Sequence, residues 1–348
     1  MEFIDLLFFK FKRIYLIKFA KRGGIELNQE ILRVKDLGIN FYLEDRVIPA
    51  VDGVSFSLSK GETLGIVGES GCGKSVTALS IMGLLQTPPA KIVKGEIWFK
   101  GENLLSKSDE EMRKIRGNDI SIIFQEPMTA LNPVFTIGQQ ISEVIMQHQN
   151  LSKKEALART IQMLKLVQIP LPERIIKQYP HQLSGGMRQR VMIAMALACN
   201  PELLIADEPT TALDVTVEAQ ILKLINELKE KLGSAVIMIS HDLGVVAEIA
   251  DKVAVMYCGR IVEYGDVHSI FNEPKHPYTR GLLDAIPDID RDKEQGLKEI
   301  RGVVPSPDEI KEGCRFKTRC DCAKGDCLVE EPPLAEVGSS FVRCWNYM

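Results

Sequence analysis

A glycine-rich stretch carries the clearest chemical signal in the sequence. It reads Gly68-Glu69-Ser70-Gly71-Cys72-Gly73-Lys74-Ser75 and matches the pattern G-x-x-x-x-G-K-[ST]. Glycines let backbone N–H groups turn toward phosphate oxygens, and the start of a following helix adds the positive end of its dipole. Lys74 is expected to reach the β- and γ-phosphates, and Ser75 to ligate Mg²⁺. We therefore predict a nucleotide site formed by Gly68, Ser70, Gly71, Cys72, Gly73, Lys74, Ser75 and Val76.

Two acids follow the apolar run Leu203–Ala206. The first, Asp207, is placed to hold Mg²⁺ directly or through a water molecule. The second, Glu208, is the candidate base that orients or deprotonates an attacking water. Acids often end strands, so the pair is a weak signal alone. The glycine-rich stretch earlier in the chain makes the catalytic interpretation much stronger.

The elements that must position these residues alternate between strands and helices. Apolar, β-rich runs are typical of parallel strands that are buried on both faces. The patterns predict strands at 31–41, 51–62, 63–67, within 95–125, at 203–207, 235–240 and 253–266, and helices at 74–85 and about 217–232. This alternation predicts an α/β fold. A mostly helical block, residues 136–200, is inserted into it.

Composition and charge limit the class of protein. The chain has 348 residues, of which 45% are apolar and 26% charged, as in a globular protein of about two domains. The formal charge of −4 is a poor match for a protein that grips nucleic acid. No apolar stretch reaches the length of about 18 residues that a transmembrane helix needs. We expect a cytoplasmic chain.

The first 22 residues are basic and rich in phenylalanine. Lys10, Lys12, Arg13 and Lys18 interrupt the apolar run, which argues against a secretory signal. Two interpretations stay open for this segment. It could lie on an anionic membrane surface as an amphipathic helix, or it could be an extension without that role.

Five of the eight cysteines lie in the last 35 residues, at positions 314, 320, 322, 327 and 344. A reducing compartment does not favour a disulfide framework, so a metal or cluster site is the first expectation. Free thiols are the alternative.

Several further motifs resemble those of ABC-transporter ATPases. Leu183-Ser184-Gly185-Gly186-Met187 resembles the LSGGQ signature, with Met in the Gln position. Gln125 resembles the Q-loop glutamine, Thr211–Asp214 the D-loop, and His241 the switch histidine. All occur in the order of that family, over about residues 30–270.

The resemblance implies a composite site between two ATPase domains. Two ATP molecules would each be bound by the glycine-rich loop of one subunit and by the signature residues of the other. Ser184, Gly185, Gly186 and Asp214 would then contribute to the partner's nucleotide. Gln125 would sense Mg²⁺ and water, and His241 would contact the γ-phosphate and hold the water with Glu208. An aromatic residue, Phe41 or Tyr42, would stack on the adenine.

The last third of the chain resembles the C-terminal region of oligopeptide/dipeptide importer ATPases. The resemblance rests on His276–Leu283 and on the segment around Gly313–Cys320. It implies four thiolate ligands for a [4Fe–4S] cluster, with zinc as the alternative, at Cys314, Cys320, Cys327 and Cys344. Cys322 is additional. The resulting division is a basic, apolar N-terminal extension at 1–29, an ABC ATPase domain at 30–270 with a helical subdomain at about 127–200, and an irregular cysteine-rich C-terminal domain at 271–348.

This resemblance implies an ATP-hydrolysing subunit that energises a membrane importer of dipeptides or oligopeptides. Its partners would be two transmembrane permease subunits, a second ATPase subunit that is unlike or identical, and, indirectly, an external peptide-binding protein. It would act at the cytoplasmic face of the membrane and dock through residues 126–143. The alternatives are a soluble ABC ATPase acting on DNA, an importer ATPase for nickel or another small solute, and a subunit that binds ATP without turnover.

Overall fold

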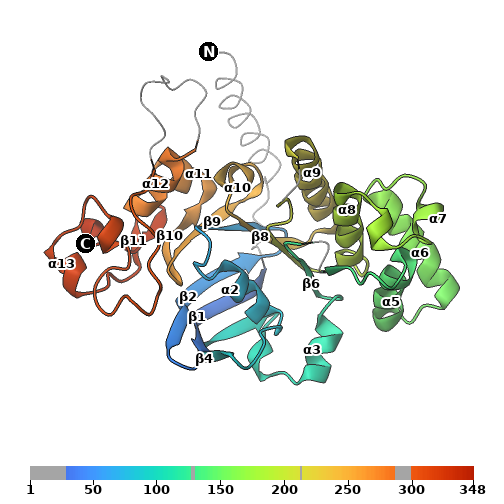
Figure 1. The fold of residues 1–348 in the computed structure, drawn as a ribbon, viewed down its shortest axis with the longest axis horizontal. Coiled ribbons are helices and arrows are strands. Elements are labelled where there is room, and N and C mark those ends of the chain that lie inside the picture. Colours follow the sequence, from blue (N-terminus) through green and yellow to red (C-terminus); the bar gives the residue numbers. More distant parts are fainter. Residues whose placement is uncertain (1–28, 127–129, 212–213, 287–298) are drawn as a thin grey trace, which may run out of the picture.

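The computed structural model describes residues 29–126, 130–211, 214–286 and 299–348. In Figure 1, the N-terminal strands lie below the central sheet, a group of helices lies to one side, and the C-terminal region lies on the other side. The predicted N-terminal extension, residues 1–28 of it, lies outside the described residues. Within the described part of the chain, no helix combines the length and the apolar character needed to span a bilayer.

The main sheet has eight strands in the order β11-β12-β10-β9-β3-β8-β7-β6. The strands are β3 (Thr63–Val67), β6 (Ile120–Ile123), β7 (Leu203–Asp207), β8 (Ala235–Ser240), β9 (Lys252–Tyr257), β10 (Arg260–Asp266), β11 (Ala335–Val337) and β12 (Ser340–Val342). The pairs β6–β7, β7–β8, β8–β3 and β3–β9 are parallel. Every residue of β3, β7 and β8 is buried, which explains why these strands are continuous apolar runs.

A second, antiparallel sheet packs against the first. Its strands are β1 (Glu30–Tyr42), β2 (Val47–Ser59), β4 (Ala90–Phe99) and β5 (Glu102–Asn103), in the order β2-β1-β4-β5. Leu32, Ile39 and Val54 from this sheet share one apolar core with Leu64 and Ile66 of β3. The short helix α3 (Asp109–Ile115) leads from this sheet to β6.

The helical block forms a second apolar core with the other side of the main sheet. It contains α5 (Ile137–Gln149), α6 (Lys153–Leu166), α7 (Pro172–Ile175) and α8 (Gly185–Ala196). Capping boxes at Thr136/Gln139 and Ser152/Glu155 fix the starts of α5 and α6. The remaining helices beside the parallel strands are α2 (Lys74–Ile81), α9 (Val215–Leu232) and α10 (Leu243–Ile249).

The C-terminal region continues the main sheet. Its helices are α11 (Val267–Asn272), α12 (Pro277–Asp284) and α13 (Gly325–Val329). Strand β12 pairs with β10 and so covers an edge that would otherwise be exposed. The sequence predicted little regular structure here, because strands of three residues are too short to show a clear alternation. The division at residue 271 therefore stays a prediction.

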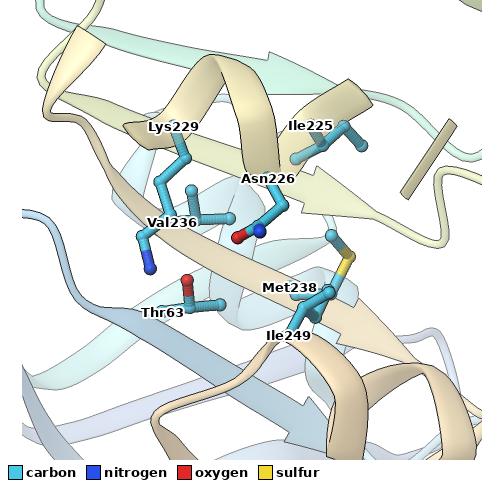
Figure 2. Close-up of a pocket in the computed structure, with 7 residues that line it drawn as sticks. All are labelled: Thr63, Ile225, Asn226, Lys229, Val236, Met238 and Ile249. Atoms are coloured by element: carbon cyan, nitrogen blue, oxygen red, sulfur yellow. The ribbon is translucent and has the colours of Figure 1, made fainter. Parts of the chain in front are cut away.

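Figure 2 shows a small pocket between β3, β8, α9 and α10, lined by Thr63, Ile225, Asn226, Lys229, Val236, Met238 and Ile249. Thr63 is the first residue of β3, whereas the glycine-rich stretch follows its last residue. The pocket therefore lies at the wrong end of the strand to be part of a nucleotide site.

The buried His276 is expected to make folding stability depend on pH. Burial, with smaller effects of Arg343 and Arg280, lowers its pKa from 6.5 to about 3. As the pH falls below 6.5, the unfolded chain therefore takes up this proton before the folded chain does. The stability contributed by neutral His276 is complete above that pH and is lost toward pH 3. We expect a loss of about 2 kcal/mol at about pH 5.

The variant His276→Asn provides the measurement, since Asn can still accept the hydrogen bond that Tyr278 N donates to Nδ1 of His276. Urea unfolding at about pH 7.5 and about pH 5 should show that the wild type loses about 2 kcal/mol more than the variant. Equal losses in the two proteins would show that another group titrates.

Candidate functional site

The glycine-rich loop joins the end of β3 to the start of α2 and is closely packed at two glycines. Gly68 and Gly73 have φ values of 150° and 100°. A Cβ at Gly68 would lie 2.2 Å from the carbonyl oxygen of Met256, and one at Gly73 would lie 2.5 Å from that of Ala50. Only glycine fits at either position. The side of the loop at Gly71 is open, since no described atom lies within 4 Å of a Cβ placed there.

Lys74 begins α2 and turns its ammonium group into the loop. Its Nζ donates to the carbonyl oxygens of Gly68 at 2.7 Å and Glu69 at 3.0 Å, and the Sγ of Cys72 lies 3.7 Å away. Lys74 is only 5% exposed. A cation held this close to a helix N-terminus is well placed to bind a phosphate oxygen.

Ser75 and Asp207 meet although 132 residues separate them in the chain. The hydroxyl of Ser75 donates to Oδ1 of Asp207 at 3.0 Å. Burial raises the pKa of Asp207, the hydrogen bond from Ser75 opposes this shift, and the charge of Glu208 adds to it. A cation beside Asp207 would offset the effect of burial. Hydroxyl and carboxylate oxygens are ligands that suit Mg²⁺.

Three side chains converge on one carboxylate oxygen of Glu208. Its Oε2 accepts hydrogen bonds from Nε2 of Gln125 at 2.7 Å and Oγ1 of Thr211 at 3.1 Å, and lies 3.3 Å from Nδ1 of His241. These residues follow β6, β7 and β8, which are neighbours in the sheet. The structure thus brings together Gln125, Glu208 and His241, and their role in catalysis stays a prediction.

Glu208 itself has a left-handed backbone, with φ of 45°. This conformation costs about 1 kcal/mol or more for a residue with a side chain and is found most often at functional sites. Its N–H donates to the carbonyl oxygen of Ile239 at 3.0 Å, which holds the turn against β8.

Two contributors to this site were not predicted. Thr211 belongs to the predicted D-loop, a motif that predicts no contact with Glu208. Gln189 of α8 is buried, and its Nε2 donates to the carbonyl oxygen of Pro209, next to Glu208. A glutamine among the polar residues of a helix gives no sequence signal that it is buried or what it contacts.

The signature residues lie elsewhere. Ser184 is the N-cap of α8, and its Oγ accepts a hydrogen bond from Met187 N at 3.3 Å. In Figure 1, α8 lies with α5, α6 and α7, away from α2. Asp214 is likewise an N-cap, at the start of α9, and accepts from Val217 N at 3.0 Å. Ser184, Gly185 and Asp214 are exposed. Residues 212 and 213 of the predicted D-loop lie outside the described residues.

The two candidate aromatic residues are at the end of β1. Phe41 is partly buried and packs against the core shared by the two sheets. Tyr42 is 47% exposed. Which of them stacks on a base stays a prediction.

The prediction of an iron–sulfur cluster, or of zinc, at Cys314, Cys320, Cys327 and Cys344 is wrong. These four cysteines are among the described residues, which contain no group of three or more His, Cys, Asp or Glu side chains that could hold a metal ion. All four are free thiols. Burial raises the pKa of Cys314 to about 12 and also raises the pKa of Cys320 and of Cys344. That favours neutral thiols over the thiolates that a metal binds.

Comparisons with known proteins match both parts of the chain. The ABC transporter family model matches residues 51–211, and the model of the oligopeptide/dipeptide transporter C-terminal region matches residues 262–327. A probable peptide ABC transporter ATP-binding protein of Sinorhizobium fredii is 56% identical, over 91% of this chain and 95% of that protein. The oligopeptide transport ATP-binding protein AppD of Bacillus subtilis is 54% identical, over 91% of this chain and 97% of that protein.

Solved structures agree with this assignment. The ATP-binding cassette MJ0796, solved as a dimer in a post-hydrolysis state with ADP and Pi, is 29% identical and has a TM-score of 0.62. The match covers 68% of this chain and 99% of that one. Relatives with more than half of their residues identical extend over almost the whole chain, so their family is also its family. The protein belongs to the ABC-transporter ATPases, in the group that carries the oligopeptide/dipeptide transporter C-terminal region.

Proposed function

We propose that this chain binds and hydrolyses ATP to drive the import of dipeptides or oligopeptides through a membrane permease. The observation that carries the proposal is the similarity, over 91% of the chain, to ATP-binding proteins named for peptide, oligopeptide and dipeptide transport. The match of residues 262–327 to the oligopeptide/dipeptide transporter C-terminal region supports it independently of the ATPase core.

In this proposal the triphosphate lies on the glycine-rich loop. The residues from Gly68 to Val76 surround it, Lys74 binds its phosphate oxygens, and Phe41 or Tyr42 stacks on the base. The positive φ values at Gly68, Gly71 and Gly73 support this role, because they let the backbone of the loop bend over the start of α2. Mg²⁺ would be held by Ser75, Gln125 and Asp207, and it would neutralise charge on the phosphates.

Glu208 acts on the water. Hydrolysis forms a bond between the water oxygen and the γ-phosphorus, breaks the bond from that phosphorus to the bridging oxygen, and releases ADP and phosphate. Glu208 accepts the proton of the water. Gln125 and His241 hold the carboxylate of Glu208 in place from two neighbouring strands, at 2.7 Å and 3.3 Å, which supports its assignment as the base.

The second half of the site comes from another ATPase subunit. Ser184, Gly185 and Gly186 would bind the γ-phosphate held by the partner, with Asp214 at the same interface. The exposed N-terminus of α8 supports this role, since it offers a hydroxyl and the positive end of a helix dipole to an anion. The partner would be a related but different ATPase or a second copy of this chain.

The permease would dock on the segment that follows Gln125. Residues 127–129 lie outside the described residues, but Val134 is 71% exposed and Phe135 is 46% exposed. Apolar side chains in this position suit contact with a membrane subunit. The chain would thus be bound peripherally at the cytoplasmic face of the membrane, and an external binding protein would select the peptide.

Replacing Glu208 with glutamine tests the catalytic assignment. Glu208→Gln removes the proton acceptor and keeps the shape of the side chain. We expect ATP hydrolysis by the assembled transporter to fall at least about 100-fold, measured as phosphate release, while calorimetry still detects MgATP binding. The control is Glu227→Gln on α9, whose side chain is 53% exposed and should leave the rate unchanged. Wild-type rates in Glu208→Gln would assign the base elsewhere.

A signature variant tests the composite site. Ser184→Arg places a bulky side chain at the N-terminus of α8, far from the loop that holds the nucleotide of the same chain. We expect MgATP to bind with unchanged affinity, whereas ATP-driven pairing in the Glu208→Gln background is lost. Light scattering with MgATP, with this chain alone and with the second ATPase, gives the readout. Pairing that persists with Ser184→Arg would contradict the two-sided arrangement.

Transport tests the substrate class. Cells without the wild-type gene should take up labelled dipeptides or longer peptides when they carry the wild-type chain or Glu227→Gln, and lose at least about 90% of that uptake with Glu208→Gln. Parallel measurements use Ni²⁺ and an oligosaccharide. Uptake of either one, instead of peptides, through the wild-type chain would overturn peptide import while leaving the ATPase assignment intact.

A further inference from the structure

The glycine-rich loop is held from the C-terminal region through Glu69, its second residue. Oε2 of Glu69 accepts a hydrogen bond from Nη1 of Arg319 at 2.7 Å, and Oε1 accepts one from Nη2 at 3.0 Å. The N–H of Glu69 donates to the hydroxyl of Tyr278 at 2.9 Å. Arg319 is 250 residues away from Glu69 in the chain. These contacts join the candidate nucleotide site to the region that distinguishes this group of ATPases.

Arg319 pairs with the carboxylate of Glu69 from a buried position. Its side chain is 4% exposed. Its third nitrogen, Nε, donates to the carbonyl oxygen of Arg301 at 2.9 Å, and Nη2 also lies 3.5 Å from that of Ile300. The guanidinium carbon lies 5.8 Å from the ring centroid of Tyr257 and 6.0 Å from that of Phe316. A planar fork that pairs with both oxygens of Glu69 requires arginine, because lysine cannot supply this geometry.

Aromatic rings pack against one another and around Arg319. The rings of Tyr257 and Tyr278 are 4.7 Å apart between centroids, and Phe316 lies 5.2 Å and 5.4 Å from them. Tyr257 ends β9, beside β3, whereas Phe316 comes from the C-terminal region. Burial raises the pKa of Tyr278, so its hydroxyl stays protonated and uncharged as it accepts from Glu69 N.

Glu69 is also directly connected to the lysine of the loop. Its carbonyl oxygen accepts a hydrogen bond from Nζ of Lys74 at 3.0 Å. A shift of Glu69 would therefore move a carbonyl group that positions the lysine ammonium, and it would change the turn between Gly68 and Ser70. Glu69 thus contacts Arg319 through its carboxylate and contacts the Lys74 ammonium, which is proposed to bind phosphate, through its carbonyl oxygen.

We propose that Arg319 is a positioning residue for ATP binding. By holding Glu69 with both carboxylate oxygens, it keeps the glycine-rich loop in the shape that receives the triphosphate, and the C-terminal region thereby sets the affinity of the ATPase core for MgATP. The inference rests on the proposed nucleotide site. It gives the C-terminal region a role in ATP binding in addition to its strand pairing with the main sheet.

The test measures MgATP binding by calorimetry in the full-length chain, with Glu208→Gln in the background so that the nucleotide stays intact. We expect Arg319→Gln and Glu69→Gln each to weaken MgATP binding about tenfold. The double variant should be no weaker than either single variant, because both changes remove the same interaction. Arg319→Lys, which keeps the charge but not the fork, should recover only part of the affinity.

A matched control comes from the same region. Arg301 pairs with Asp321 at 3.4 Å, and both side chains are largely exposed, so Arg301→Gln should bind MgATP as the parent does. Thermal unfolding without nucleotide is recorded for every variant. If Arg319→Gln does not fold, Glu69→Gln and Arg319→Lys still decide the question.

Two outcomes would overturn the proposal. The first is unchanged MgATP affinity in folded Arg319→Gln or Glu69→Gln, with only a lower unfolding temperature, which would make the ion pair purely structural. The second is additive losses in the double variant. Failure of the parent chain to bind MgATP at all would instead reject the proposed nucleotide site, so the two failures are distinguishable.

Discussion

The site depends on strands that are parallel neighbours, because the carboxyl ends of such strands lie at the same edge of the sheet. Strands β3, β8, β7 and β6 lie side by side, and the residues that follow their carboxyl ends must therefore meet. This edge brings Ser75 to Asp207 and places Gln125 and His241 around Glu208. No segment alone contains the site. Burial of these strands on both faces fixes their register, and that register sets the distances between the polar groups.

The C-terminal region is tied to this core by charge as well as by strand pairing. Asp52 of β2 accepts hydrogen bonds from Arg315 at 2.6 Å and from Arg260 at 2.7 Å, and lies 3.2 Å from Nζ of Lys94. Burial would raise the pKa of Asp52, but the charges of Arg260 and Arg315 outweigh it and hold the pKa below its usual value. Removing Asp52 would take away the carboxylate that Arg260, Arg315 and Lys94 share. The antiparallel sheet, the main sheet and the C-terminal region are thus held in one arrangement.

The sequence predicts an element correctly where a local pattern of apolar residues reflects burial. The apolar runs at 203–207 and 235–240 coincide with β7 and β8. Contacts between distant residues leave no such pattern. Neither the burial of Gln189 nor the reach of Arg319 to Glu69 can be recognised from the residues around them. The cysteine prediction failed for a related reason: it rested on residue types and on a resemblance, and these specify neither the direction of a side chain nor its protonation.

The N-caps of α8 and α9 are both exposed, which suits the proposed pairing of two ATPase subunits. Ser184 and Asp214 each accept a hydrogen bond from a backbone N–H of their own helix, and both residues are exposed. The carboxylate of Asp214 already complements the N-terminus of α9, whereas the cap of α8 is an uncharged serine, which suits an anion on another molecule. In the proposed pair that anion is the γ-phosphate on the partner's loop, so hydrolysis followed by release of phosphate removes the contact that joins the subunits. The hydrogen bond from Gln189 to Pro209 is then important. It connects α8, which begins at the signature residues, to the residue next to Glu208, the proposed base.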